Sequence, residues 1–185
     1  MKHFLLLLLL TLLLGCDGPY NDCPQYKFSD NYKSYTFFNE GSWWVYEDTA
    51  FHKTDSMSLI AQSVEFIDYC DYNTQSEEVL EQQFSSTFFT VNNKIHGHAS
   101  FGEYNTDGSV PVGIFMDSGK VAQPPEFLDS LRVNDVWYQS VYVFKNGNHE
   151  YYWAKNIGLV KKVLPYPVTG DTVYHFNLVK YHLKK

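Results

Sequence analysis

The chain has 185 residues and a formal net charge of −7 at neutral pH, and 18% of its residues are aromatic. This length suits one ordinary domain, and the acidic balance argues against a nucleic-acid partner because a negative surface repels phosphate backbones. Tyr and Phe are abundant and favour strands, and long helical periodicity is absent. The composition therefore predicts a β-rich protein.

The N-terminus carries a short apolar run. After Met1-Lys2-His3, residues 4–14 are apolar except for Thr11. As a helix this run would be about 16 Å long at 1.5 Å per residue, too short for a bilayer core, so it predicts a removable secretion signal. It ends in Leu13-Leu14-Gly15-Cys16, which resembles the lipobox of bacterial lipoproteins. In that family a diacylglyceryl group is attached to the cysteine thiol and the signal is cleaved before it.

The lipobox resemblance implies that the protein is held on a membrane by lipid on Cys16. Each buried acyl methylene contributes about 0.8 kcal/mol, so two or three chains would make the attachment effectively permanent. The alternatives are an uncleaved anchor and a plain signal peptide with a chance cysteine. We expect a location in the cell envelope, at the outer membrane rather than the inner one, although Asp17 is an inner-membrane retention signal in enteric bacteria.

The sequence divides into three segments: a lipoprotein signal peptide at 1–15, a polar lipidated tether at 16–35 and a single all-β domain at 36–185. If Cys16 carries lipid, Cys23 and Cys70 remain as an even pair in an oxidising compartment. A disulfide between them would join the tether to the domain. Their spacing does not show that the two Cβ atoms approach each other, so a pair of buried thiols is the alternative.

The domain consists of short segments with strand-like patterning. In chain order these are 41–46, 57–70, 82–91, 94–103, 110–116, 136–144, 149–154, 158–164 and 172–183. Asn146-Gly147 favours a tight turn, so 136–144 and 149–154 should pair antiparallel. The turn at 168–171 should likewise join 158–164 to the last strand. Two short helices are expected at 77–83 and 125–131.

The last strand has an irregular apolar pattern. Tyr174, Phe176 and Leu178 alternate on one face, and the alternation then continues on the other face from Val179. One regular strand cannot keep both sets in one core, so we expect a bulge or a sharp bend near Leu178 and Val179. Together the segments predict an all-β fold, an antiparallel meander forming a strongly curved sheet or open barrel, with at most short helices.

Two further motifs accompany the lipobox. They are Gly-Ser-Trp-Trp-Val-Tyr at 41–46 and Tyr-Trp-Ala-Lys-Asn-Ile-Gly-Leu-Val-Lys at 152–161. With these motifs the chain resembles uncharacterised Bacteroidota-type lipoproteins. The resemblance implies an all-β domain that faces the periplasm or the cell surface, and it brings no assigned activity. We interpret Gly158 as a backbone bend and Lys155 as a solvated side chain.

The aromatic surplus suggests a binding surface. Curved sheets can hold an apolar ligand, and exposed rings can stack on sugars, so an apolar or carbohydrate ligand is the expected chemistry. The candidate ligand platform consists of Trp43, Trp137, Tyr151 and Trp153. The alternative, that these rings form the core, is favoured.

Catalytic and metal-binding motifs are weak. His96 and His98 would share one face of a strand and are the best metal candidates, but a third ligand is missing and surface histidines are the favoured interpretation. No phosphate loop or dinucleotide motif occurs, so we expect no cofactor. The sequence predicts a membrane-anchored envelope lipoprotein with a ligand-binding or structural role. An envelope hydrolase or metal-dependent enzyme is the alternative, and it would require polar groups converging in a pocket.

Overall fold

The computed structural model describes residues 25–67, 76–88, 93–98, 115–116, 126–146, 148–165 and 173–184. Within these ranges one element is helical and the others are strands. The elements are β1 (Gln25–Tyr26), α2 (Asp30–Thr36), β2 (Trp43–Asp48), β3 (Lys53–Ile67), β4 (Ser76–Ser86), β5 (Asn93–His98), β6 (Phe115–Met116), β7 (Glu126–Val133), β8 (Val136–Asn146), β9 (His149–Ala154), β10 (Gly158–Pro165) and β11 (Val173–His182).

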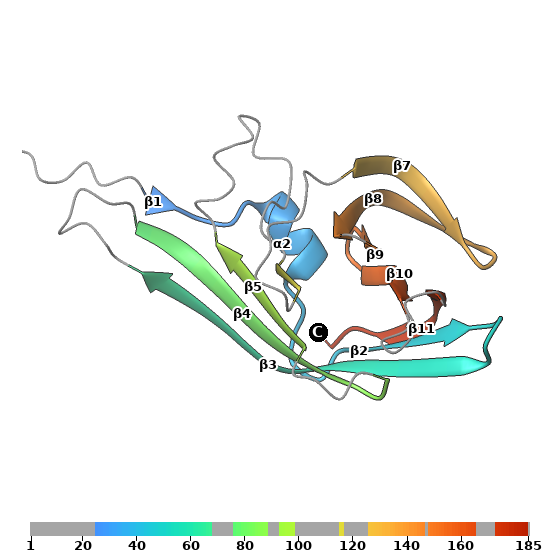
Figure 1. The fold of residues 1–185 in the computed structure, drawn as a ribbon. Coiled ribbons are helices and arrows are strands. Elements are labelled where there is room, and N and C mark those ends of the chain that lie inside the picture. Colours follow the sequence, from blue (N-terminus) through green and yellow to red (C-terminus); the bar gives the residue numbers. More distant parts are fainter. Residues whose placement is uncertain are drawn as a thin grey trace, which may run out of the picture.

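The described strands form one sheet with the order β6-β5-β4-β3-β2-β11-β10-β9-β8-β7, and β1 adds to β4 in parallel. The sheet therefore consists of two antiparallel meanders, β2–β6 and β7–β11, which are joined where β2 pairs antiparallel with β11. Figure 1 shows the sheet curling into an open half-barrel around α2. The predicted all-β meander is confirmed, as are the antiparallel pairs β8–β9 and β10–β11.

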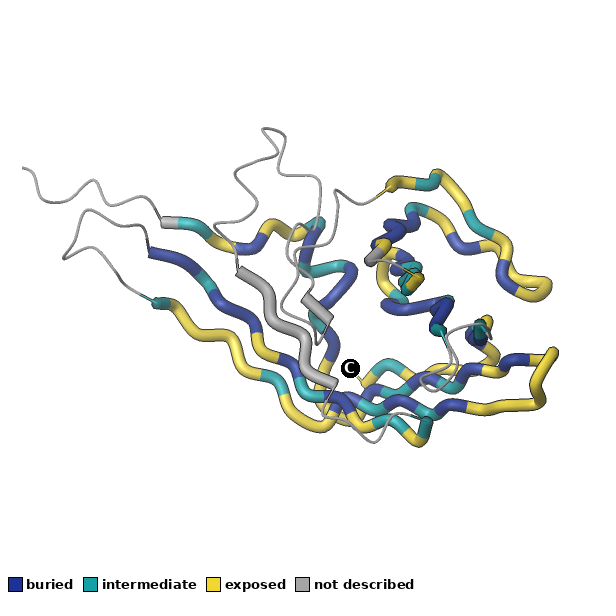
Figure 2. The backbone as a smooth tube through the Cα atoms, viewed as in Figure 1, coloured by how far each residue is buried: buried dark blue, intermediate teal, exposed yellow. Residues whose placement is uncertain are grey.

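Burial follows this curvature. Figure 2 shows buried residues alternating with half-buried or exposed ones along β2 and the first half of β3, and a nearly continuous buried run along β10. A strand that alternates has one covered face, whereas a strand buried along its length is covered on both. The main core cluster lies on the concave side and includes Trp44, Tyr46, Trp153 and Phe176.

Helix α2 lies on the concave side of the sheet. Ser29 is its N-cap, and the Ser29 hydroxyl accepts a hydrogen bond from the Tyr32 backbone amide at 3.1 Å. Tyr32 packs with Phe28 and with Leu80 of β4. The Tyr35 ring packs edge-on against the Tyr142 ring of β8, with 5.0 Å between the ring centres. The helix therefore connects the two meanders by contacting both of them.

Residues 25–35, which belong to the predicted tether, pack against the sheet. Tyr32 and Tyr35 are buried, and the Phe28 backbone amide donates to a Glu78 carboxylate oxygen at 2.8 Å. The folded domain therefore begins before residue 36. The polar residues of this segment suggested a tether because they occupy the capping positions and exposed sides of a short helix.

Both predicted helices are wrong. Residues 77–83 lie in β4, which pairs with β3 over most of its length, and residues 126–131 lie in β7, which pairs with β8. The Glu, Gln and Leu residues of 77–83 have good helix propensity. Pairing with two neighbouring strands outweighs propensity differences of a few tenths of a kcal/mol per residue.

The sheet bends at irregular positions. The register of β11 against β2 shifts between Leu178 and Lys180, which confirms the predicted bulge at Val179. Similar shifts occur between Leu59 and Ala61 in β3 and between Leu159 and Lys161 in β10. Bulges increase local twist and bend a strand, so these shifts help the sheet to curl.

Gly158 opens β10 at a position that suits glycine. Its φ is +90°, and a Cβ placed there would lie 2.9 Å from the Phe38 ring. The predicted backbone bend is confirmed. Gly41 also has a positive φ of +88°, but a Cβ there would meet only the Lys184 side chain, at 3.3 Å.

These two glycines provide a matched pair of substitutions. We expect Gly41→Ala to lower the free energy of unfolding by about 1–2 kcal/mol, the cost of a left-handed backbone for alanine. Gly158→Ala should lower it by about 1–3 kcal/mol more, because the buried Phe38 ring must also move. Urea denaturation of both variants measures the difference, and equal losses would show that the contact with Phe38 has no cost.

Candidate functional site

A buried ion pair lies on the concave side of the sheet. Asp55 points inward from β3, in alternation with the buried residues Met57 and Leu59. Lys162 points inward from β10, and its Nζ contacts Asp55 Oδ2. The exposed fractions of the two side chains are 0% for Asp55 and 5% for Lys162, so both charges are removed from water.

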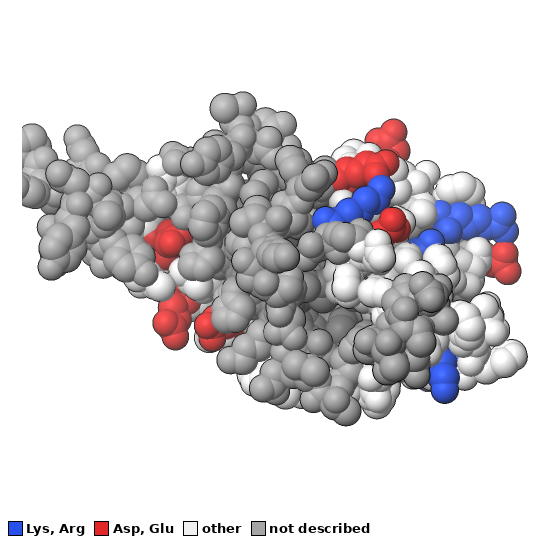
Figure 3. All heavy atoms as spheres, in the orientation of Figure 1, with Lys and Arg blue, Asp and Glu red and all other residues white. Residues whose placement is uncertain are grey.

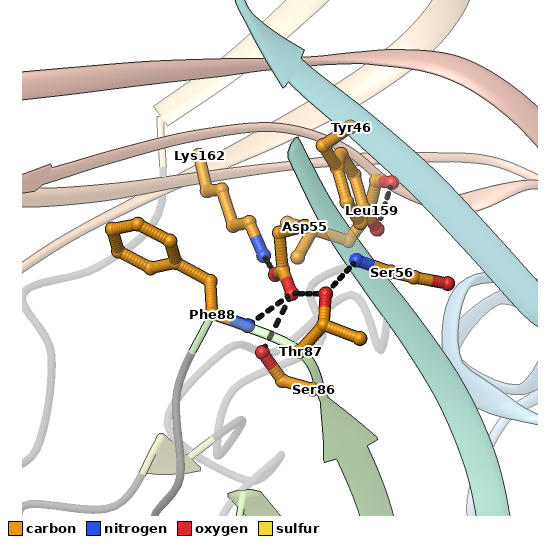
Figure 4. A network of polar contacts seen from close by, with 8 residues as sticks. All are labelled: Tyr46, Asp55, Ser56, Ser86, Thr87, Phe88, Leu159 and Lys162. Atoms are coloured by element: carbon orange, nitrogen blue, oxygen red, sulfur yellow. Dashed lines mark hydrogen bonds and ion pairs between the residues drawn. The ribbon is translucent and has the colours of Figure 1, made fainter. Parts of the chain in front are cut away.

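The second oxygen of Asp55 accepts several hydrogen bonds. Oδ1 accepts from Ser86 Oγ at 2.7 Å, from the Phe88 backbone amide at 3.1 Å and from Thr87 Oγ1 at 3.3 Å. Figure 4 shows these donors converging from the end of β4. The Ser56 amide in turn donates to Thr87 Oγ1 at 2.8 Å. Both carboxylate oxygens are thus satisfied, as a buried charge requires.

Aromatic rings surround the lysine ammonium group. Lys162 Nζ lies 4.4 Å from the centre of the Tyr46 ring and 5.3 Å from that of Phe176. The Tyr46 hydroxyl donates to the Leu159 carbonyl at 2.9 Å, which holds the ring in place. Ring faces attract a cation most strongly where water is excluded, so they partly replace the hydration that the ammonium group has lost.

Contact between Asp55 and Lys162 requires a curled sheet. Strands β2 and β11 lie between β3 and β10 in the strand order. Neighbouring strands are about 4.8 Å apart, so a flat sheet would separate β3 from β10 by roughly 14 Å. Extended lysine and aspartate side chains fall short of that span. The ion pair therefore forms only because the sheet curls, and it joins the two meanders across their junction.

Burial and charge act in opposite directions on this pair. Burial alone would raise the pKa of Asp55, but the Lys162 charge and the hydrogen bonds from Lys162, Ser86 and Phe88 outweigh it and hold the pKa below its usual value. Burial lowers the pKa of Lys162, and Asp55 only partly opposes this shift. The Asp55 carboxyl group is therefore ionised at neutral pH.

This pair was not predicted, although the sequence contains a signal for it. Lys161 and Lys162 stand next to each other in an otherwise apolar strand. Adjacent residues on a strand point to opposite faces, so one of the two lysines had to point toward the core. A buried lysine in turn requires a carboxylate partner, but the pattern did not identify Asp55.

The four proposed platform residues differ in exposure. Trp153 is 1% exposed and belongs to the core, and its ring N–H has no acceptor among the described residues. Trp137 is 62% exposed. Trp43 and Tyr151 are half-buried. Strands β9, β10 and β11 separate Trp43 on β2 from Trp137 on β8, so the four rings do not form one continuous platform.

Trp43 is already engaged by its neighbours. Its ring stacks on His182 at 5.9 Å between centres, and Lys180 Nζ lies 5.6 Å from the ring. Tyr151 stacks on His149 in a similar way, at 6.4 Å. Of the four candidates, Trp137 therefore presents the largest accessible ring surface.

Acidic and basic side chains are intermixed on the surface of β7–β9. Lys145 Nζ lies 3.0 Å from a Glu126 oxygen, and the Tyr152 hydroxyl donates to Glu150 at 2.5 Å. Figure 3 shows acidic and basic side chains side by side in this region. Exposed pairs of this kind contribute little stability, about 0–1 kcal/mol each, and the mixture does not create a patch of one sign.

Several predicted residues cannot be placed. Cys16, Cys23 and Cys70 lie outside the described residues, so the lipid attachment and the disulfide remain predictions. His96 and His98 lie on β5, where only the backbone is described. Among the residues that the structure describes, no group of three or more His, Cys, Asp and Glu side chains is arranged to hold a metal ion. Within the same ranges, no helix has the length and apolar character needed to cross a bilayer.

Comparisons with protein-family models, with curated proteins and with solved structures found no match. The residues of this chain are therefore the basis for assigning a function.

Replacing one partner of the buried pair should be costly. We expect Lys162→Met to lower the free energy of unfolding by about 3–5 kcal/mol, because it leaves Asp55 buried without its partner. Lys161→Met, one residue away on the half-buried side of β10, should cost less than about 1 kcal/mol. Urea denaturation at neutral pH measures both changes. Equal losses would contradict the assignment of Lys162 as the lysine that points inward.

Stability should also fall at alkaline pH. Burial, and secondarily the charge of Asp55, raises the pKa of Tyr46 well above its usual value of 10.0. The stability contributed by the neutral phenol is fully present below pH 10 and is lost as pH rises toward the folded pKa. We expect Tyr46→Phe to lose less stability than the natural chain between about pH 9 and 11.

Tyr181→Phe is the control for this pH dependence, because Tyr181 is an exposed tyrosine. Its unfolding free energy, measured by urea denaturation at each pH, should follow the natural chain. If the unfolding free energies of Tyr46→Phe and the natural chain fall in parallel as pH rises, ionisation of Tyr46 does not cause the loss of stability at alkaline pH.

Proposed function

We propose that the chain is a membrane-anchored cell-envelope lipoprotein whose all-β domain has a ligand-binding or structural role. The observation that carries this proposal is the Leu13-Leu14-Gly15-Cys16 sequence after a positively charged start and a short apolar run. Lipid on Cys16 would hold the domain at a membrane through the segment before β1. The outer membrane is the favoured location.

The packing of the domain favours binding on an outer surface over binding inside the curl. The concave side contains a cluster of buried residues, among them Trp44, Tyr46, Trp153 and Phe176. These rings belong to one packed cluster that also contains Tyr35 of α2, and Lys162 lies near the Tyr46 and Phe176 rings, so they serve the core. An exposed indole, in contrast, can stack on a sugar ring or an apolar ligand. We therefore narrow the proposed platform to Trp137, which is 62% exposed.

The alternative of an envelope hydrolase or metal-dependent enzyme requires polar groups in an accessible pocket. The buried polar groups around Asp55 are enclosed, with exposed fractions of 0% and 5% for the two charged side chains. A substrate could not reach them without opening the sheet. This cluster therefore does not support the enzyme alternative.

Lipid attachment can be tested directly. We expect Cys16→Ala to abolish labelling by radioactive palmitate and to release or mislocalise the protein, because the acylated sulfur is removed. Cys23→Ala and Cys70→Ala keep that sulfur and should be labelled as strongly as the natural chain. Undiminished labelling of Cys16→Ala would contradict the proposed anchor.

The surface role of Trp137 has a separate test. We expect Trp137→Ala to leave the melting temperature nearly unchanged and to reduce retention on immobilised polysaccharides. Trp153→Ala should lower the free energy of unfolding by about 3–5 kcal/mol, because it removes a large buried ring. Retention that is unaffected by Trp137→Ala, or that is absent from the natural chain, would favour the structural role.

A further inference from the structure

We propose that Asp55 and Lys162 join covalently, forming an amide between the lysine Nζ and the aspartate Cγ. The two groups come from strands β3 and β10 and are 107 positions apart in the sequence. The product would be a covalent bridge across the junction of the two meanders. This site is independent of the lipid anchor and of any ligand.

The geometry places the amine against the carboxyl group. Lys162 Nζ contacts Asp55 Oδ2, and the Tyr46 and Phe176 rings flank the ammonium group at 4.4 and 5.3 Å. Reactive groups held in contact by a fold behave as if present at effective concentrations of about 10⁵–10⁸ M. Figure 4 shows Lys162 reaching the Asp55 carboxyl group, with Phe88 also beside that carboxyl group.

The reaction balances without another reactant. An ammonium group and a carboxylate give an amide and one water molecule. The Nζ–Cγ bond forms and the Cγ–Oδ2 bond breaks, and two of the three ammonium protons leave with Oδ2 as water. The third proton remains on the amide nitrogen. Nothing is oxidised or reduced, and the pair loses both of its charges.

The donors on Oδ1 are placed to assist this step. Transfer of one ammonium proton from Lys162 Nζ to Asp55 Oδ2 gives a neutral amine and a neutral carboxylic acid. Attack of this amine on Cγ would then transfer negative charge to Oδ1, which already accepts hydrogen bonds from Ser86 Oγ, the Phe88 amide and Thr87 Oγ1 at 2.7–3.3 Å. Preorganised donors at an oxygen that gains charge stabilise a tetrahedral intermediate. The oxygen that leaves, Oδ2, is the one that faces the lysine protons.

Burial favours the amide over the ion pair. The two side chains are almost fully enclosed, so each charge has lost its hydration, and the amide removes both charges. Burial also lowers the pKa of Lys162, which increases the fraction of nucleophilic neutral amine. Exclusion of bulk water limits the reverse hydrolysis.

Peptide mapping of the full-length protein tests the proposal. Trypsin has no cleavage site within 54–94, and it does not cut after a lysine whose amine is acylated. We therefore expect a branched peptide joining 54–94 to 162–180, lighter by one water than the sum of the two. The digest is made under reducing conditions so that cysteine pairing does not contribute. Recovery of unmodified 54–94, with cleavage after Lys162, would overturn the proposal.

Lys162→Arg is the matched control. Arginine keeps the charge but does not form this amide, so its digest should contain linear 54–94 with its full mass. Loss of water from 54–94 in this variant would place the dehydration elsewhere and overturn the proposal. On a reducing denaturing gel the natural chain should migrate faster than Lys162→Arg, because its internal loop stays closed. If the variant does not fold, the peptide map of the natural chain decides the question alone.

Discussion

Contact between Asp55 and Lys162 is the constraint on which the rest of this fold depends. The two residues lie on strands that are separated by β2 and β11, so they meet only when the sheet curls. Whether they form an ion pair or a bond, the contact joins β3 to β10 over the junction of the meanders. A buried ion pair contributes little net stability compared with well-packed apolar residues, but breaking one is costly. Its main effect is therefore to select the curled arrangement over flatter ones.

The curl determines where function can reside. Closing the sheet around α2 places Tyr35 against Tyr142 and Trp44 against Phe38, and the Trp44 ring N–H donates to the Ile157 carbonyl at 2.7 Å. Large aromatic rings thus fill the concave side as a core. The proposed binding surface is therefore an outward-facing one at Trp137, and the proposed membrane attachment lies in the segment before the sheet.

Sequence patterns predicted features that depend on local geometry. The antiparallel pairing of β8 with β9 follows from the turn preference of the Asn-Gly sequence between them, and the bulge at Val179 follows from a break in alternation. Residues 77–83 were misassigned because their helix propensity is local, whereas the pairing of β4 with β3 and β5 is not. The helix at Asp30–Thr36 was missed because its polar residues also fit a linker, although Ser29 was a recognisable N-cap.

The candidate site was harder to predict than the fold. Trp137 and Trp153 have the same side chain and similar strand contexts, yet one is exposed and the other is buried. Lys162 could have been found as a lysine in an apolar strand. Its partner could not, because Asp55 lies in a distant strand that reaches Lys162 only across the curl.

Native-state hydrogen exchange of the backbone amides in β2 and β11 tests the central claim most directly. If the Asp55–Lys162 contact holds the two meanders together where β2 pairs with β11, these amides should exchange only through global unfolding. Their free energy of exchange should then equal that of the slowest amides of the core. The account is contradicted if the β2–β11 amides exchange through a partial opening while those of the β8–β9 hairpin remain protected.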